Sequence, residues 1–144
     1  MTPLVQERAE LSIDIEGPAM IDITAKVRDW LRDIGARDGL LTLFLRHTSA
    51  SLTIQEAGDP KLRADLLSAL TRLLPSGAGV RQSGSDRQNI LPAHIKALLA
   101  SVSLSVPVFG SDMALGALQG IFLIEHRARQ GARGVLLHFV GALS

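Results

Sequence analysis

Apolar and polar residues alternate near the start of the chain and then change to a helical spacing. From Ala9 to Ile15 the apolar side chains recur at every second position, which predicts a half-buried strand. Gly17 and Pro18 end this segment. Apolar residues then recur every three or four positions over residues 23–34, which predicts a helix that Gly35 ends in a left-handed conformation. An apolar run over residues 40–45 predicts the next strand.

The middle of the chain carries the signals of a second helix. Asp59 is suited to the N-cap and Pro60 to the first helical position, and leucines at helical spacing continue until Pro75 closes the segment. Residues 76–91, rich in Gly, Ser and polar residues, are predicted to form a long loop. Pro92 is predicted to open a short helix.

The last third of the chain predicts three strands, at residues 102–108, 117–127 and 134–140, with residues 128–133 as a hairpin connection between the last two. The predicted helices lie between predicted strands, but the order is not a repeating strand–helix–strand unit. This order predicts an α+β fold. A length of 144 residues fits a single domain over residues 1–144.

Composition limits the partners and the chemistry. The net charge is +1 and the basic residues are spread along the chain, which argues against nucleic acid or a membrane surface as the main partner. The chain has no cysteine, which excludes disulfides and thiolate chemistry. No signal peptide and no apolar run of about 18 residues is visible in the sequence, so a cytoplasmic location is expected.

The segment Arg46–Pro60, RHTSASLTIQEAGDP, is the first place to expect a functional site, because it joins two apolar segments through polar residues. His47 follows a strand. It is either satisfied by a backbone carbonyl at the strand end, or acts as a general base or metal ligand. Small hydroxyl side chains and acidic residues of this segment could bind a phosphorylated substrate: Thr48, Ser49, Ser51, Glu56 and Asp59. Asp59 and Glu56 are also explained as a helix cap and a solvated residue.

Two further segments carry candidate groups. His94, expected in the first turn of a helix, would be disfavoured as a cation by the helix dipole, which suits a neutral ligand or proton acceptor. Gln119 and Glu125 share one face of a predicted strand, and a carboxylate there is either at the sheet rim or buried and paired. His126 lies on the opposite face and is expected to be structural or exposed, as is His138.

The blocks RHTSASLTIQEAGDP, PAHIK, SVPV and LGALQGIFLIEH, in this order and spacing, resemble the YjbQ-like family of small proteins described as secondary thiamine-phosphate synthases. The resemblance implies a homotrimer. It also implies coupling of a thiazole phosphate with an aminopyrimidine diphosphate, with release of pyrophosphate. His47, His94 and Glu125 are then the expected catalytic residues, and Thr48, Ser49, Glu56, Asp59 and Gln119 the expected substrate-binding residues.

Diphosphate chemistry normally needs a divalent ion, so zinc or magnesium is a possible cofactor, with His47 and His94 as its histidine ligands. The chain also departs from the family pattern at several positions. These are Gln55 and Ala57 in place of asparagines, Leu118 in place of tryptophan, Gln82 in place of a loop histidine, and Asn89 and Ile90 in place of acidic residues. The departures leave open an alternative, a non-enzymatic trimeric protein that binds a metal or a small anion.

Overall fold

The computed structural model describes residues 2–74 and 87–144. The strands are β1 (Val5–Glu16), β2 (Ala19–Asp22), β3 (Ala36–Leu45), β4 (Ala50–Glu56), β5 (Ser103–Phe109), β6 (Asp112–Met113), β7 (Gln119–Glu125) and β8 (Gln130–Leu143). The helices are α1 (Thr24–Asp33), α2 (Pro60–Leu73) and α3 (Arg87–Leu99). Three helices with these strands confirm the predicted α+β class.

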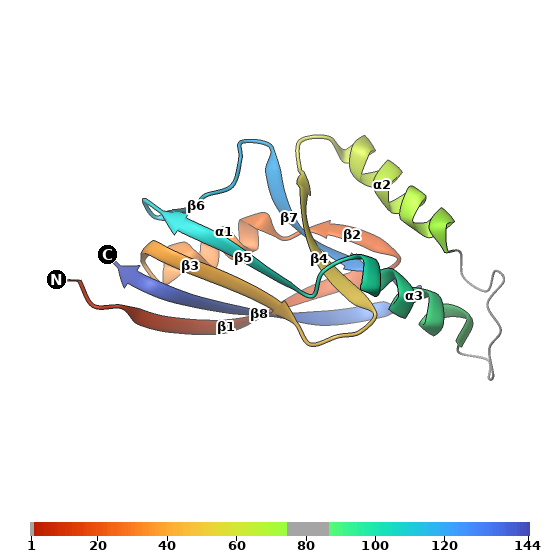
Figure 1. The fold of residues 1–144 in the computed structure, drawn as a ribbon, viewed down its shortest axis with the longest axis horizontal. Helices are drawn as coiled ribbons and strands as arrows, with labels where there is room; N and C mark the ends of the chain where they lie inside the picture. The colour runs from red at the N-terminus through yellow and green to blue at the C-terminus, as the bar shows by residue number, and fades with distance from the viewer. Residues whose placement is uncertain (1, 75–86) are drawn as a thin grey trace.

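The strands form two antiparallel sheets. The larger sheet has five strands in the order β1-β8-β3-β5-β6, and the smaller has three in the order β2-β7-β4. In Figure 1, β4 and β7 run across the direction of β3, β5 and β8, while α2 and α3 lie toward the same end of the molecule. β7 is therefore the centre of the smaller sheet and carries side chains into the layers on both of its sides.

The main core lies between the two sheets and includes one face of α1. It contains Val27 and Leu31 of α1, Leu41 and Leu43 of β3, Leu52 of β4, Ile121 and Leu123 of β7, and Leu137 and Phe139 of β8, all fully buried or nearly so. A smaller cluster of Met20, Phe122 and Ile124 lies on the other face of the smaller sheet, where Leu67 and Leu70 of α2 pack against it. Both faces of β7 are therefore covered.

Local signals at the helix ends agree with the sequence. The Asp59 carboxylate accepts a hydrogen bond from the Lys61 backbone N–H at 2.9 Å, and Pro60 occupies the first helical position of α2. Gly35, just after α1, has φ +72°, the left-handed conformation that glycine adopts without a steric penalty.

The structure corrects several predicted boundaries. The first strand runs from Val5 rather than Ala9, and β8 begins at Gln130, so residues 130–133 belong to a strand rather than to the hairpin loop. α3 begins at Arg87, five residues before the predicted start at Pro92. Residues 76–86 of the predicted loop, with Gln82, lie outside the described residues. No helix in the described part of the chain is both long and apolar enough to cross a membrane.

Candidate functional site

The predicted site residues His47 and Glu125 belong to one polar cluster at an end of the main core. Period-two alternation places Glu125 on the face of β7 that also carries Ile121 and Leu123, so its side chain points between the two sheets. The same alternation places Arg133 on the inward face of β8. Glu125 is 0% exposed and Arg133 is 4% exposed, so two charged groups meet where the sheets converge.

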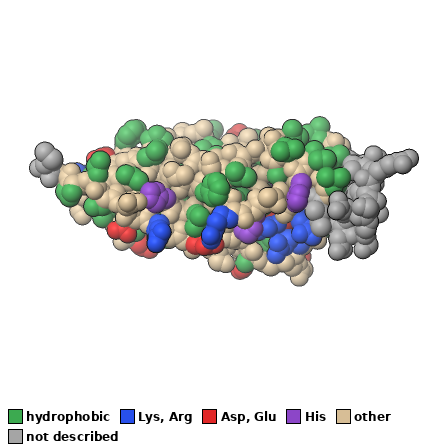
Figure 2. Space-filling model, turned by 60° about the horizontal axis from the view of Figure 1, so that its bottom comes forward, with side chains coloured by type: hydrophobic (Ala, Val, Ile, Leu, Met, Phe, Trp, Pro, Cys, Tyr) green, Lys and Arg blue, Asp and Glu red, His purple; other side chains and the backbone are tan. Residues whose placement is uncertain are grey.

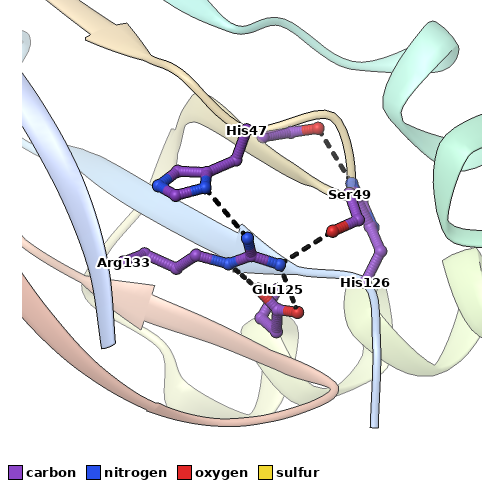
Figure 3. A network of polar contacts seen from close by, with 6 residues as sticks. His47, Ser49, Glu125, His126 and Arg133 are labelled. Atoms are coloured by element: carbon purple, nitrogen blue, oxygen red, sulfur yellow. Dashed lines mark hydrogen bonds and ion pairs between the residues drawn. The ribbon is translucent and has the colours of Figure 1, made fainter. Parts of the chain in front are cut away.

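Arg133 is the centre of the cluster. Its Nε and Nη2 donate to the two carboxylate oxygens of Glu125 at 2.7 and 2.9 Å. Nη2 also donates to the Ser49 hydroxyl at 2.8 Å, and Nη1 lies 3.0 Å from Nδ1 of His47. Figure 3 shows the guanidinium between these three side chains. The buried pair is thus bidentate and hydrogen-bonded on all sides, which is what allows a carboxylate to remain charged away from water.

The contact with Arg133 fixes the proton of His47. A guanidinium has only N–H donors, so Nδ1 of His47 must accept, and the proton of the neutral ring lies on Nε2. The pKa of His47 is lowered below its ordinary value, first by burial and next by the charge of Arg133, while Glu125 acts in the opposite direction. His47 is therefore held as a neutral imidazole with Nε2–H as a donor. Figure 3 shows this second nitrogen pointing away from the side of Ser49 and His126.

A second polar group lies on the opposite face of the smaller sheet. His126 is 4% exposed, and its Nε2 lies 2.8 Å from the Ser51 hydroxyl, while its backbone N–H donates to the Ser49 carbonyl. The pKa of His126 is lowered to about 4, mainly by burial and then by the charge of Lys96. His126 is therefore a neutral structural residue, one of the two roles expected for it.

α3 carries a lysine, Lys96, whose side chain faces the interior of the protein. Ala93 and Lys96, three positions apart, both face the protein and are 0% and 3% exposed. Burial lowers the pKa of the Lys96 ammonium below its ordinary value. Among the described residues, Lys96 has neither an ion-pair nor a hydrogen-bond partner.

His94 lies on the exposed side of α3 and shares a cavity with His47. The cavity has a volume of about 380 Å³ and is lined mainly by apolar side chains of α3, together with His47, Thr48 and His94. The Thr48 hydroxyl and Nε2 of His94 are 3.4 Å apart, a long contact. Because α3 starts at Arg87, His94 is not in its first turn, and the predicted effect of the helix dipole on His94 does not apply.

The other three predicted site residues lie at the opposite end of the smaller sheet. Glu56 pairs with Gln119, whereas Ala50 pairs with Glu125, so the two ends are six positions apart along β7. At the usual rise per residue this is about 20 Å. The amide oxygen of Gln119 accepts from the Gly116 N–H at 2.7 Å, and Asp59 caps α2. Within one chain the structure therefore brings His47, His94 and Glu125 near one another, but not Gln119, Glu56 or Asp59.

The cluster at His47 is poorly suited to a metal ion. Both oxygens of Glu125 are taken by Arg133, and Nδ1 of His47 accepts from the same guanidinium. In residues 2–74 and 87–144, no group of three His, Asp or Glu side chains is arranged to hold an ion. His47 could bind a metal only through Nε2, after loss of the proton there or of the contact with Arg133.

Arg133 and Lys96 are not among the residues predicted from the sequence to belong to the site. Arg133 was placed in a loop, although the alternation of Val135, Leu137 and Phe139, extended backward by one step, puts it on the inward face. Lys96 is three residues from Ala93, a spacing that indicates a common helix face. Figure 2 shows several basic side chains and a histidine close together toward the end of the molecule that carries α3.

The sequence matches a known family over nearly its whole length. A family model described as "UPF0047 protein YjbQ-like" matches residues 9–142. A UPF0047 protein of Synechocystis sp. is 35% identical over 136 residues, covering 94% of this chain and 92% of the relative. The YjbQ protein of Salmonella typhimurium is 38% identical over 120 residues, covering 83% and 86%. These matches confirm the resemblance predicted from the motifs.

Solved structures agree. A hypothetical protein of Aeropyrum pernix superposes with a TM-score of 0.83 at 27% identity, covering 94% of this chain and 98% of that one. A protein of Sulfolobus solfataricus, described as YbjQ-like and of unknown function, superposes with a TM-score of 0.87 over 96% and 99% of the two chains. Its 19% identity shows the shared fold alone.

Proposed function

The chain belongs to the YjbQ-like UPF0047 family, and from this premise we propose that it is a cytoplasmic transferase of the thiamine-phosphate synthase type. It acts on a phosphorylated small molecule bound beside His47. The observation that carries the proposal is the contact from Arg133 to Nδ1 of His47, because it prepares a neutral imidazole with its N–H available to a ligand.

The chemistry of such a histidine is that of a hydrogen-bond donor. A neutral imidazole whose Nε2–H faces a ligand can polarise a phosphate or carbonyl oxygen without giving up its proton. Arg133 cannot itself bind the ligand anion through its Nε or Nη2, because those groups are occupied by Glu125 and Ser49. Glu125 therefore acts through Arg133 on His47, as a positioning residue rather than a group that touches the substrate.

His94 and Thr48 add polar groups to an otherwise apolar cavity. A cavity of about 380 Å³ with mainly aliphatic walls fits a small heterocycle, and its polar edge fits one or two acceptor atoms. This supports a ligand that joins an apolar ring to an anionic group, as a thiazole phosphate does. Gln119, Glu56 and Asp59 could contribute to the same site only from another copy of the chain. The proposed assembly is a homotrimer.

A zinc or magnesium cofactor has less structural support than a phosphorylated ligand. The pyrophosphate leaving group would be stabilised by a divalent ion, but the oxygens of Glu125 are occupied and Glu56 and Asp59 lie at the far end of β7. The alternative hypothesis is a protein that binds a metal or an anion without catalysis. It uses the same donor groups, those of His47, Thr48 and His94. It is favoured because, among the described residues, the two carboxylates whose charges act on His47 are already paired, Glu125 with Arg133 and Glu10 with Arg46, which leaves neither to serve as a base.

The test is a thermal-shift screen of the purified protein with phosphorylated small molecules, including thiazole phosphate and aminopyrimidine diphosphate, each with and without Mg²⁺ or Zn²⁺. A true ligand raises the unfolding temperature by mass action. Any pair that binds is then assayed for formation of the coupled phosphate product and pyrophosphate.

We expect His47→Ala to lower the rate about 10²–10³-fold, the usual effect of removing one preorganised donor. The control is Lys26→Ala, an exposed residue of α1 that lies neither beside His47 nor on the outer face of the larger sheet. Binding without product formation would support the non-enzymatic alternative, and equal rates for both variants would remove His47 from the mechanism.

A further inference from the structure

The turn between β7 and β8 holds Arg129 in a fixed backbone position. Its N–H donates to the Arg127 carbonyl at 3.0 Å, and its carbonyl accepts from the N–H of Gly17 at 2.9 Å. Gly17 belongs to the turn between β1 and β2, so two turns from distant parts of the sequence brace each other here. The backbone of Arg129 therefore contributes little conformational freedom of its own to the position of its guanidinium.

Gly131 makes room for this guanidinium. Gly131 has φ +141°, and a Cβ atom added to it would lie only 3.0 Å from Nη2 of Arg129. The Arg129 side chain therefore folds back over the place where a side chain at position 131 would stand. Gly131, which is exposed, precedes the buried Arg133 of β8 by two residues. The Arg129 guanidinium therefore lies beside Gly131, and its charge acts on His47 together with that of Arg133.

Of the arginines near His47, two have an ion-pair partner among the described residues and Arg129 does not. Arg133 is paired with Glu125, and Arg46 is paired with Glu10 at 3.0 Å. Among the described residues, Arg129 has no ion-pair partner, and its side chain is only partly exposed. The charge of Arg129 also reaches His47, where it adds to burial and to Arg133 in lowering the pKa of the imidazole. Arg129 is thus the cation near His47 whose charge is available to a ligand.

We propose that Arg129, together with Nε2–H of His47, binds the phosphate or diphosphate group of the ligand. This inference rests on the proposed function, since it names the group that recognises the anion at the same site. Neutral donors alone compensate poorly for the loss of water around a multiply charged anion. A guanidinium adds full charge and several N–H groups in a planar arrangement suited to phosphate oxygens. Gly131 is then a positioning residue, because a side chain there would displace the guanidinium.

The experiment is calorimetric titration of the full chain with inorganic phosphate and, separately, inorganic pyrophosphate, at low and at moderate salt. The variants are Arg129→Gln, Arg129→Lys and, as matched control, Arg127→Gln in the same turn. Arg127 is not among the charges that act on His47. Urea unfolding confirms that each variant is folded. The two titrants distinguish a site for one phosphate group from a site for a diphosphate.

We expect Arg129→Gln to weaken anion binding at least about tenfold and to reduce its dependence on salt, with Arg129→Lys intermediate and Arg127→Gln within about twofold of the wild type. If Arg129→Gln binds as the wild type does while His47→Ala is weakened, the assignment of Arg129 is wrong and the proposed function stands. If the wild-type protein binds neither titrant nor any phosphorylated compound of the thermal-shift screen, both proposals fail.

Discussion

Substitution of Arg133 or Glu125 is expected to reduce the stability of the fold strongly. A buried ion pair adds little stability compared with apolar residues, but removal of one partner leaves an uncompensated charge that costs about 3–5 kcal/mol. Both side chains here are almost completely buried, and Arg133 also supports Ser49 and His47. The pair therefore links the stability of the fold to the protonation of the site.

We expect Glu125→Gln to lower the free energy of unfolding by about 3 kcal/mol, since the amide cannot neutralise Arg133. It should also lower the pKa of His47 further, because the charge of Glu125 normally raises it. Urea unfolding and an NMR titration of the histidines would measure the two effects. The double variant Glu125→Gln with Arg133→Met should lose less stability than the sum of the single changes. Additive losses would mean that the pair is not coupled.

Because His126 is buried as a neutral side chain, we expect the free energy of unfolding to fall in mild acid. Its pKa is about 4 in the folded protein against an ordinary value of 6.5, so the unfolded chain binds more protons between these pH values. Stability should therefore fall as the pH falls through this window, by about 2 kcal/mol between pH 7 and pH 5 from this residue alone. Urea unfolding at both pH values measures the loss. His126→Gln should lose correspondingly less, and an unchanged pH dependence would assign the effect to other groups.

At the residue scale the sequence predicted part of the site. His47 and Glu125 were both expected to be catalytic residues, and the alternative of a buried, paired Glu125 is confirmed. The partner was not predicted, because Arg133 lies at the boundary where turn composition and strand alternation overlap. Ser49 and Ser51 were expected to be available to a phosphate, but their hydroxyl groups contact Arg133 and His126 instead. Such partners are set by strand pairing between distant segments, which local patterns do not contain.

At the scale of elements, α3 differs most from the expectation. The sequence predicted that Pro92 opens the helix, but Pro92 is the sixth residue of α3. The first four N–H groups of any helix lack intrahelical partners, so a proline just beyond the first turn removes only one hydrogen bond. A proline therefore marks the start of a helix only to within about one or two turns. The shift matters for function, since it moves His94 away from the positive end of the helix dipole.

The inward lysine of α3 predicts an unusual stabilising substitution. Lys96 is 3% exposed and burial lowers its pKa, so its ammonium is destabilised where it stands. We expect Lys96→Met to raise the free energy of unfolding at neutral pH by about 1 kcal/mol, because methionine fills similar space without a charge. The wild-type protein should gain stability as the pH rises toward 10.5, since the unfolded chain then binds more protons, and the variant should lack this gain.

Urea unfolding at neutral and alkaline pH would measure both effects of Lys96→Met. The matched control is Lys26→Met on α1, where the lysine is exposed and the change should be within about 0.5 kcal/mol. Destabilisation by Lys96→Met but not by Lys26→Met would show that the ammonium of Lys96 has a stabilising partner.

At the scale of the whole molecule, the outer face of the five-stranded sheet is not covered by any described element. This face carries several exposed apolar side chains. Leu40 of β3 pairs with Val140 of β8 on one side and Pro107 of β5 on the other, and Phe44 lies two positions on from Thr42 along the same face. Leu40, Val140 and Phe44 are 45%, 42% and 41% exposed. Thr42 and its pairing partners His138 and Ser105 separate these apolar residues into two groups, and exposed apolar groups of this kind on a small protein are typical of an interaction surface.

The arrangement of the sheets was the least predictable level. The sequence indicated most strands, but not that β8 pairs with both β1 and β3, which joins the two ends of the chain to its middle. For the same reason Gln119 and Glu125 were grouped in one site, although they stand at opposite ends of β7. An alternating pattern fixes the face of a residue and leaves its neighbours across the sheet undetermined.

The separation of Gln119 from His47 gives the predicted homotrimer a specific role, because a second copy could bring the far end of β7 to the His47 cavity. We expect light scattering to give three times the monomer mass at micromolar concentration. The double variant Leu40→Lys with Val140→Lys should reduce the mass, since it places like charges on the exposed apolar face. Leu73→Lys is the control, because Leu73 is 70% exposed on α2, outside this sheet. A trimer that survives the double variant would place the interface elsewhere. A monomer in the wild-type protein would leave Gln119, Glu56 and Asp59 outside the site altogether.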